Sequence, residues 1–206
     1  MVMDMKEMEK GNSALKGKKL DFEQIKKNGI KETLNHYKFI PKKNFLSYKY
    51  LVLYIIVLTM ILVGDQITKQ IISTTIKERD GIAIIQDFFY FTYTKNFGGA
   101  WSILEGQMWL FYIVTVIAIV SIYHYFIQTK KHEELTRFGL VLVLAGALGN
   151  FIDRLLFGYV RDFIHFQFKS FEFPIFNIAD IAITIGIMFV LFEIVMEEYK
   201  IWKLSK

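Results

Sequence analysis

Two aspartates, Asp162 and Asp180, stand beside strongly apolar stretches of this 206-residue chain. An ionisable side chain next to hydrocarbon is costly, so it marks a functional site in a membrane protein by default. Two carboxyl groups a few ångströms apart share a proton, so that one accepts a proton from water while the other donates one. The pair fits metal-free peptide hydrolysis, and it also fits a proton relay or a cation pathway.

Asparagine and arginine side chains accompany the aspartates at helical spacing. Asn150 and Asp153 are three residues apart and therefore share one helix face, with Arg154 next to it. Asn177 and Asp180 repeat this relation further along the chain. Amide groups can orient a peptide backbone, and a guanidinium can bind an anion or hold a carboxylate.

Other catalytic layouts find little support in the sequence. Asp65 and Lys69 are four apart on one helix face, which favours a structural ion pair over direct chemistry. Ser73 with Lys69 has the spacing of a Ser–Lys hydrolase, but such pairs are common by chance. The segment His132–Thr136 lacks the second histidine of a zinc peptidase. The chain has no cysteine, which excludes thiolate ligands and thiol nucleophiles.

Composition indicates one compact membrane domain. Hydrophobic residues make up 53% of the chain and aromatic residues 17%, and only two prolines occur. The net charge is +5, and 12 of the 25 lysines and arginines precede Leu51. This asymmetry indicates contact with a membrane surface and not with nucleic acid.

Four apolar segments are close to the roughly 20 residues that a membrane-spanning helix needs, and they are Tyr48–Val63, Met108–Ile127, Phe138–Phe157 and Ile175–Met196. Lysine and arginine gather before the first span, between the second and third, and after the fourth. The positive-inside rule therefore places both termini in the cytoplasm and both aspartates at the outer face.

The expected fold is an all-α polytopic membrane protein with a small extracytoplasmic β-element between the first two helices. The β-element is predicted from β-branched and aromatic residues at 82–85 and 88–94. We expect a polar, basic cytoplasmic tail over 1–46, a four-helix domain over 47–200 and a short cytoplasmic tail over 201–206. The first tail is either a surface-associated amphipathic helix around Phe22–Tyr37 or a disordered basic arm.

Five blocks occur in an order that resembles the lipoprotein signal peptidases, also called signal peptidase II, which are bacterial membrane aspartic peptidases. The blocks are Asp65–Lys69, Asn96–Ser102, Gly146–Arg154, Gly158–Ile164 and Phe173–Asp180. The resemblance implies four transmembrane helices in the bacterial cytoplasmic membrane, an outer β-cradle and a periplasmic helix. It implies cleavage of prolipoproteins before a diacylglyceryl-modified cysteine, by a monomer in contact with lipid and without metal, other cofactor or nucleic acid.

Transfer of the family's motif positions assigns roles to individual residues. Asp162 and Asp180 become the catalytic dyad, and Asp162 is preferred over its rival Asp153 because it follows the Gly-x-Val-x pattern. Substrate contacts are expected from Asn96, Asn150, Arg154 and Asn177, and supporting roles from Asp65, Lys69, Gly98, Gly149 and Asp153. Ile181, where the family more usually has Ser or Thr, and the long basic tail depart from the family pattern.

Two functions of other classes remain open on the residues alone. The first is a small proton-coupled carrier that uses the same carboxyl groups as a relay, although a carrier is expected to hold them nearer the membrane midplane. The second is a receptor that binds lipidated peptides without cutting them.

Overall fold

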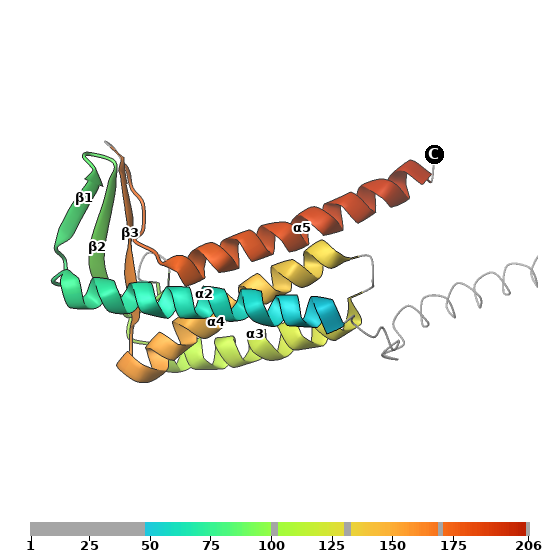
Figure 1. Ribbon diagram of the computed structural model, residues 1–206, viewed down its shortest axis with the longest axis horizontal. Coiled ribbons are helices and arrows are strands. Elements are labelled where there is room, and N and C mark those ends of the chain that lie inside the picture. Colours follow the sequence, from blue (N-terminus) through green and yellow to red (C-terminus); the bar gives the residue numbers. More distant parts are fainter. Residues whose placement is uncertain (1–47, 100–102, 130–132, 169–170, 205–206) are drawn as a thin grey trace, which may run out of the picture. The chain divides into compact units, whose positions relative to one another are not determined.

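The computed structural model describes residues 48–99, 103–129, 133–168 and 171–204 (Figure 1). Along the chain these residues form α2 (Tyr48–Thr75), β1 (Gly81–Ile85), β2 (Phe89–Asn96), α3 (Met108–Gln128), α4 (Glu134–Phe157), β3 (Val160–Phe168), β4 (Phe171–Glu172) and α5 (Ile178–Leu204). The predicted N-terminal tail lies outside the described residues.

Within the described residues, four helices are long and apolar enough to cross a membrane, as the sequence predicted. Their bounds differ from the predicted ones in two places that matter for the site. The first helix continues to Thr75, so Asp65 and Lys69 lie within it and not beyond its end. The fourth helix begins at Ile178, so Asp180 lies in its first turn.

The β-element is larger than the sequence predicted. The four strands form an antiparallel sheet in the order β1-β2-β3-β4 at one end of the helices (Figure 1). Only β1 and β2 come from the connection between the first two spans, whereas β3 carries Asp162 and pairs with β2. The periplasmic helix implied by the family resemblance is not among the elements of the described residues.

Gly158 makes the connection from α4 to β3 short. It caps α4 in the left-handed conformation, at φ 75°, and its N–H donates to Arg154 O at 3.0 Å. Glycine adopts this conformation without a steric penalty, so the helix ends there and β3 starts at Val160. Asp162 is therefore held close to the outer end of α4.

The central helix of the bundle is α4, which contacts α2, α3 and α5. Its closest neighbour is α5, because small residues let the two backbones approach each other. A Cβ added at Gly186 would lie 2.5 Å from Gly139 O, and one added at Gly139 would lie 2.6 Å from Gly186 O. Small residues of this kind are the usual means of close helix packing in membranes.

Substitution of Gly186 by alanine tests this close approach. The new methyl group would force the α4 and α5 backbones apart, and we expect a loss of roughly 1–3 kcal/mol in the free energy of unfolding. Gly64→Ala is the matched control, because nothing lies within 4 Å of its added Cβ. Thermal unfolding in detergent measures both variants. Equal unfolding temperatures for the two would contradict the close packing of α4 on α5.

Candidate active site

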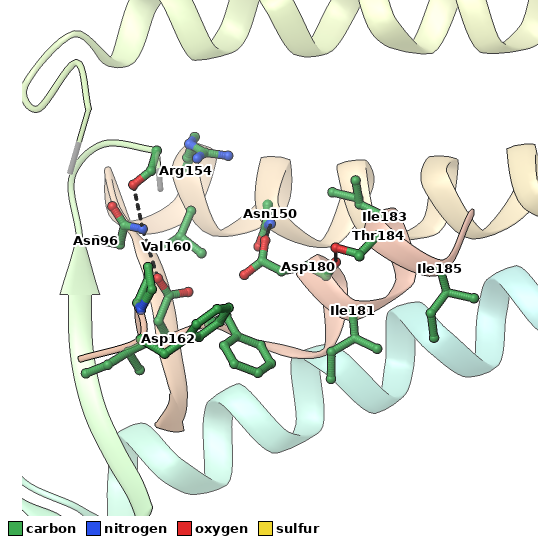
Figure 2. Close-up of a pocket in the computed structure, with 15 residues that line it drawn as sticks. Asn96, Asn150, Arg154, Val160, Asp162, Asp180, Ile181, Ile183, Thr184 and Ile185 are labelled. Carbon is green, nitrogen blue, oxygen red and sulfur yellow. Dashed lines mark hydrogen bonds between the residues drawn. The ribbon is translucent and has the colours of Figure 1, made fainter. Parts of the chain in front are cut away.

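A cavity of about 450 Å³ opens where β2, β3, α4 and α5 meet. Its polar wall is formed by Asn96, Asn150, Arg154, Asp162 and Asp180, five of the residues that the sequence marked (Figure 2). The rest of its lining is mainly apolar and comprises Gly99, Val160, Phe173, Pro174, Ile175, Phe176, Ile181, Ile183, Thr184 and Ile185. Polar groups thus converge on one side of a largely apolar pocket, as in many binding sites.

Asp162 is 2% exposed, and both oxygens of its carboxyl group accept hydrogen bonds. Asn177 Nδ2 donates to Oδ1 at 2.6 Å, and Asn96 Nδ2 donates to Oδ2 at 2.9 Å. Burial, followed by the negative charge of Asp180, raises the pKa of Asp162 to about 7, although the two amides act in the opposite direction. Its surroundings therefore favour the protonated form of this carboxyl group.

Asp180 is positioned by the capping of α5. Asn177 is the N-cap residue, and its Oδ1 accepts a bond from Asp180 N at 3.1 Å. In return, Asp180 Oδ2 accepts a bond from Asn177 N at 3.1 Å. This reciprocal arrangement is a capping box, which satisfies N–H groups that a helix start would otherwise leave unpaired. The Asn-x-x-Asp spacing therefore fixes the start of the helix and the carboxyl group together.

Amide groups connect the two aspartates. Asn150 Nδ2 donates to Asp180 Oδ1 at 2.7 Å, while Asn150 Oδ1 accepts a bond from Asn177 Nδ2 at 3.1 Å. Lys69 Nζ also donates to Asn150 Oδ1, at 2.9 Å. Because Asn177 Nδ2 also bonds to Asp162, a continuous set of hydrogen bonds links both carboxyl groups with the buried ammonium.

Three fully buried ionised residues lie behind this amide bridge. Lys69 Nζ is 2.8 Å from Asp65 Oδ2 and 3.6 Å from Asp153 Oδ2, and all three side chains are 0–1% exposed. Asp65 Oδ1 accepts a bond from Ala179 N at 2.9 Å, at the positive end of the α5 dipole. Gly149 makes room for Asp65, since an added Cβ would lie 2.7 Å from Oδ2.

Arg154 and Asn96 form the part of the polar wall next to β2. The Arg154 guanidinium stacks 4.5 Å from the Phe111 ring centroid, and its Nη2 donates to Gly98 O at 3.3 Å. Asn96 Oδ1 accepts a bond from Gly98 N at 2.9 Å. Arg154 Nε is buried without a hydrogen-bond partner, so the guanidinium has unused donor capacity beside the cavity.

The structure gathers all of the residues that the sequence marked, but not all of them reach the cavity. Asn177 and Asp153 are 0% exposed and are absent from the cavity lining. Direct substrate contact by Asn177 therefore disagrees with this geometry, because both of its side-chain groups are already bonded inside the protein. The Ser73 hydroxyl donates to Gln70 O and not to Lys69, which is held by Asp65.

Sequence reasoning missed Arg161 and Gln66, which complete the buried cluster. Arg161 Nη2 donates to Asp153 Oδ1 at 2.8 Å and to Gln66 Oε1 at 3.0 Å. A usable signal was the alternation of Ile164, Phe166 and Phe168 with polar residues, which is typical of a strand. If the strand is extended back to residue 160, the side chains of Arg161 and Asp162 must face opposite sides of the sheet.

Comparison with known proteins identifies the family of this chain. A family model described as "Signal peptidase (SPase) II" matches residues 55–196. The chain belongs to the signal peptidase II family. The lipoprotein signal peptidase of Latilactobacillus sakei is 47% identical over 148 residues, which are 72% of this chain and 97% of that protein. The lipoprotein signal peptidase of Staphylococcus haemolyticus is 39% identical, with 72% and 94% covered.

Solved structures show the same fold. One structure of a bacterial membrane enzyme has a TM-score of 0.69 and 38% identity, and the match covers 72% of this chain and 91% of that chain. A second has a TM-score of 0.64 and 38% identity, with 70% and 94% covered. The membrane fold predicted from the apolar spans is therefore confirmed.

The raised pKa of Asp162 predicts a pH-dependent stability. In an unfolded chain an aspartate loses its proton near pH 3.9, whereas folded Asp162 loses it at about 7. The folded state thus binds more protons within this window, so the free energy of unfolding falls as the pH rises through it. Asp162→Asn removes this contribution.

Thermal unfolding of the parent and of Asp162→Asn between pH 5 and 8 tests this expectation. The stability of the parent relative to the variant should fall with rising pH, by on the order of 1–3 kcal/mol in total. A difference that is independent of pH would mean that Asp162 ionises as easily in the folded state as in the unfolded chain.

Proposed function

We propose that this chain is an aspartic endopeptidase that cleaves prolipoproteins on the N-terminal side of a diacylglyceryl-modified cysteine. The observation that carries the proposal is the pair Asp162 and Asp180, which line one cavity from β3 and α5 in a member of the signal peptidase II family. Their burial and mutual repulsion favour a dyad that holds one proton.

The reaction needs two complementary proton transfers. The ionised member of the dyad takes a proton from a water molecule, and the oxygen of that water attacks the scissile carbonyl carbon. The protonated member donates its proton to the carbonyl oxygen, which gives a tetrahedral diol. As the carbon–nitrogen bond breaks, the carboxyl group that took the proton from water gives it to the leaving nitrogen, and the other carboxylate takes a proton back from a diol hydroxyl. The proton belongs to the coupled pair and not to one residue, and no covalent intermediate is required.

Neighbouring groups divide into those that meet the substrate and those that hold the dyad. Arg154 and Asn96 line the cavity, and a charged guanidinium in this wall suits a substrate carbonyl group. Asn150 and Asn177 are bonded to the carboxyl groups and to each other, which supports a positioning role. Asp65, Lys69 and Asp153 support that bridge from behind.

The apolar lining of the cavity supports a membrane-embedded substrate. Ile181 and Ile185 of α5 border the cavity and follow Asp180 along a membrane-spanning helix (Figure 2). The signal helix of a prolipoprotein can lie in the bilayer along this wall while its acyl chains extend into lipid. The lysine-rich tail supports an orientation with both termini in the cytoplasm and the dyad at the outer face of a bacterial membrane.

Replacement of each dyad member by asparagine tests the proposal. Asp162→Asn and Asp180→Asn keep the side-chain shape but cannot exchange the proton, so we expect cleavage to fall by about a thousandfold. Release of the signal peptide from a synthetic diacylglyceryl-cysteine substrate in detergent micelles measures the rate.

Asp87→Asn is the matched control, because Asp87 is an exposed carboxylate at the β1–β2 turn and is not among the residues that line the cavity. It should cleave like the parent. Full activity in either dyad variant would rule out the two-aspartate mechanism. Equal cleavage of the same peptide without its lipid would rule out the substrate class. Proton flux through liposomes in the absence of peptide would favour a carrier instead.

A further inference from the structure

Arg161 precedes Asp162 on β3 but points away from the cavity. Successive side chains of a strand face opposite sides, so Asp162 lines the cavity and Arg161 enters the space between α2 and α4. Arg161 is 4% exposed, which is unusual for an arginine. A guanidinium at such a place needs partners for its donors, and the structure supplies them.

Asp153 of α4 is the main partner of Arg161. Its Oδ2 accepts bonds from Arg161 N at 2.9 Å and Nε at 3.2 Å, and its Oδ1 accepts one from Nη2 at 2.8 Å. Two glutamines of α2 take further donors, with Gln70 Oε1 3.1 Å from Nη1 and Gln66 Oε1 3.0 Å from Nη2. The Phe157 ring centroid lies 4.5 Å from the guanidinium carbon.

These contacts anchor β3 immediately before Asp162. On the following side the strand is held by Phe176 O, which accepts bonds from Phe163 N at 3.0 Å and Ile164 N at 2.8 Å. The pairing of β2 with β3 is irregular between Phe91 and Thr94, and Thr94 is the residue opposite Asp162. Pairing is regular from Thr94 onwards, so β2 holds β3 at Asp162 and at the two residues before it. The forked contacts of the Arg161 guanidinium with Asp153 and the two glutamines, here called the Arg161 fork, supply a second anchor to the helices.

Arg161 also decides where Lys69 directs its hydrogen bonds. Lys69 Nζ is 2.9 Å from Asn150 Oδ1 but 3.6 Å from Asp153 Oδ2, which is already neutralised by the fork. Without Arg161, Asp153 would be a buried carboxylate with Lys69 as its nearest cation. The ammonium would then be drawn towards Asp153 and away from Asn150, the residue that bonds to Asp180.

We infer that Arg161 is a positioning residue for the catalytic dyad. Arg161 fixes the position of Asp162 through the β3 backbone. It fixes Asp180 indirectly: because Arg161 pairs with Asp153, Lys69 can bond to Asn150, which in turn bonds to Asp180. Arg161 touches neither the cavity nor the dyad carboxyl groups, so it acts on the chemical step and not on substrate binding. This role depends on the peptidase activity proposed above.

Arg161→Met removes the charge and the fork but keeps the apolar stem. Because a displacement of the dyad of about 1 Å can cost about 100-fold, we expect kcat per folded molecule to fall by about 100-fold with KM little changed. Arg161→Lys restores a cation beside Asp153 without the fork, so its kcat should lie between those of Arg161→Met and the parent. Cleavage of the lipidated peptide is followed below the unfolding temperature of each variant.

Lys95→Met is the matched control, because Lys95 lies opposite Arg161 on β2 but pairs with Glu78 at the surface. It should leave kcat unchanged. An unchanged kcat in Arg161→Met, a loss confined to KM, or equal rates for the methionine and lysine variants would each overturn the inference. A purely structural role would lower the unfolding temperature without this ordering of kcat values.

A second variant keeps the inference testable if Arg161→Met does not fold, since an unpaired buried Asp153 costs about 3–5 kcal/mol. Arg161→Met with Asp153→Asn removes both charges together and should fold, yet kcat should still be low because the strand anchor is lost. Parental kcat in this double variant would overturn the inference. Lack of cleavage by the parent itself would instead refute the proposed function.

Discussion

Burial of charge is the constraint on which the rest of this structure depends. Lys69, Asp65 and Asp153 are fully buried near the end of an apolar helix bundle, where an unpaired ion would cost several kcal/mol. Each can exist there only because its partners come from other elements, including Ala179 N of α5 and Arg161 of β3. The ion pairs join α2, α4 and β3 at one place, and the hydrogen bond from Ala179 N to Asp65 adds α5. The bilayer favours the formation of the helices but does not fix their positions relative to one another. The buried polar cluster does fix them, and so it holds together the elements that carry the dyad.

The start of α5 shows how a local sequence rule becomes site geometry. An N-cap amide and an aspartate three residues later satisfy each other, and this requirement sets the first residue of the helix. Here the same Asn177 also donates to Asp162 and Asn150 through its free amide nitrogen. Helix capping and dyad alignment thus use one side chain. A change at this position would alter the helix start and the relative placement of both carboxyl groups together.

Much of the fold could be predicted because it depends on local pattern. Apolar length predicts the four spans, and the short motifs identify Asp162, Asp180 and Arg154. The alternation after Asp162 indicates a strand, but it does not reveal the pairing partner, which is more than sixty residues away in β2. It likewise did not reveal the Arg161 fork, since the partners Gln66, Gln70 and Asp153 come from two other helices. Residue types and spacing predict candidates, but only tertiary packing decides which buried charges meet.

The two walls of the cavity resolve a conflict that hydrolysis inside a membrane protein creates. Proton exchange needs a polar, hydrated dyad, while a lipid-anchored peptide needs an apolar surface. The cavity meets both demands, because Asp162, Asp180 and Arg154 line one part of it, and Ile181, Ile183 and Ile185 line the part further along α5 (Figure 2). Because Asp180 lies in the first turn of α5, the polar wall meets the apolar wall where the membrane-spanning helix begins. A carrier would need a path for ions along the span, but beyond Asp180 the α5 lining of this cavity is isoleucine apart from Thr184, whose hydroxyl is bonded to Asp180 O. The arrangement therefore suits a reaction at the membrane boundary better than transport across it.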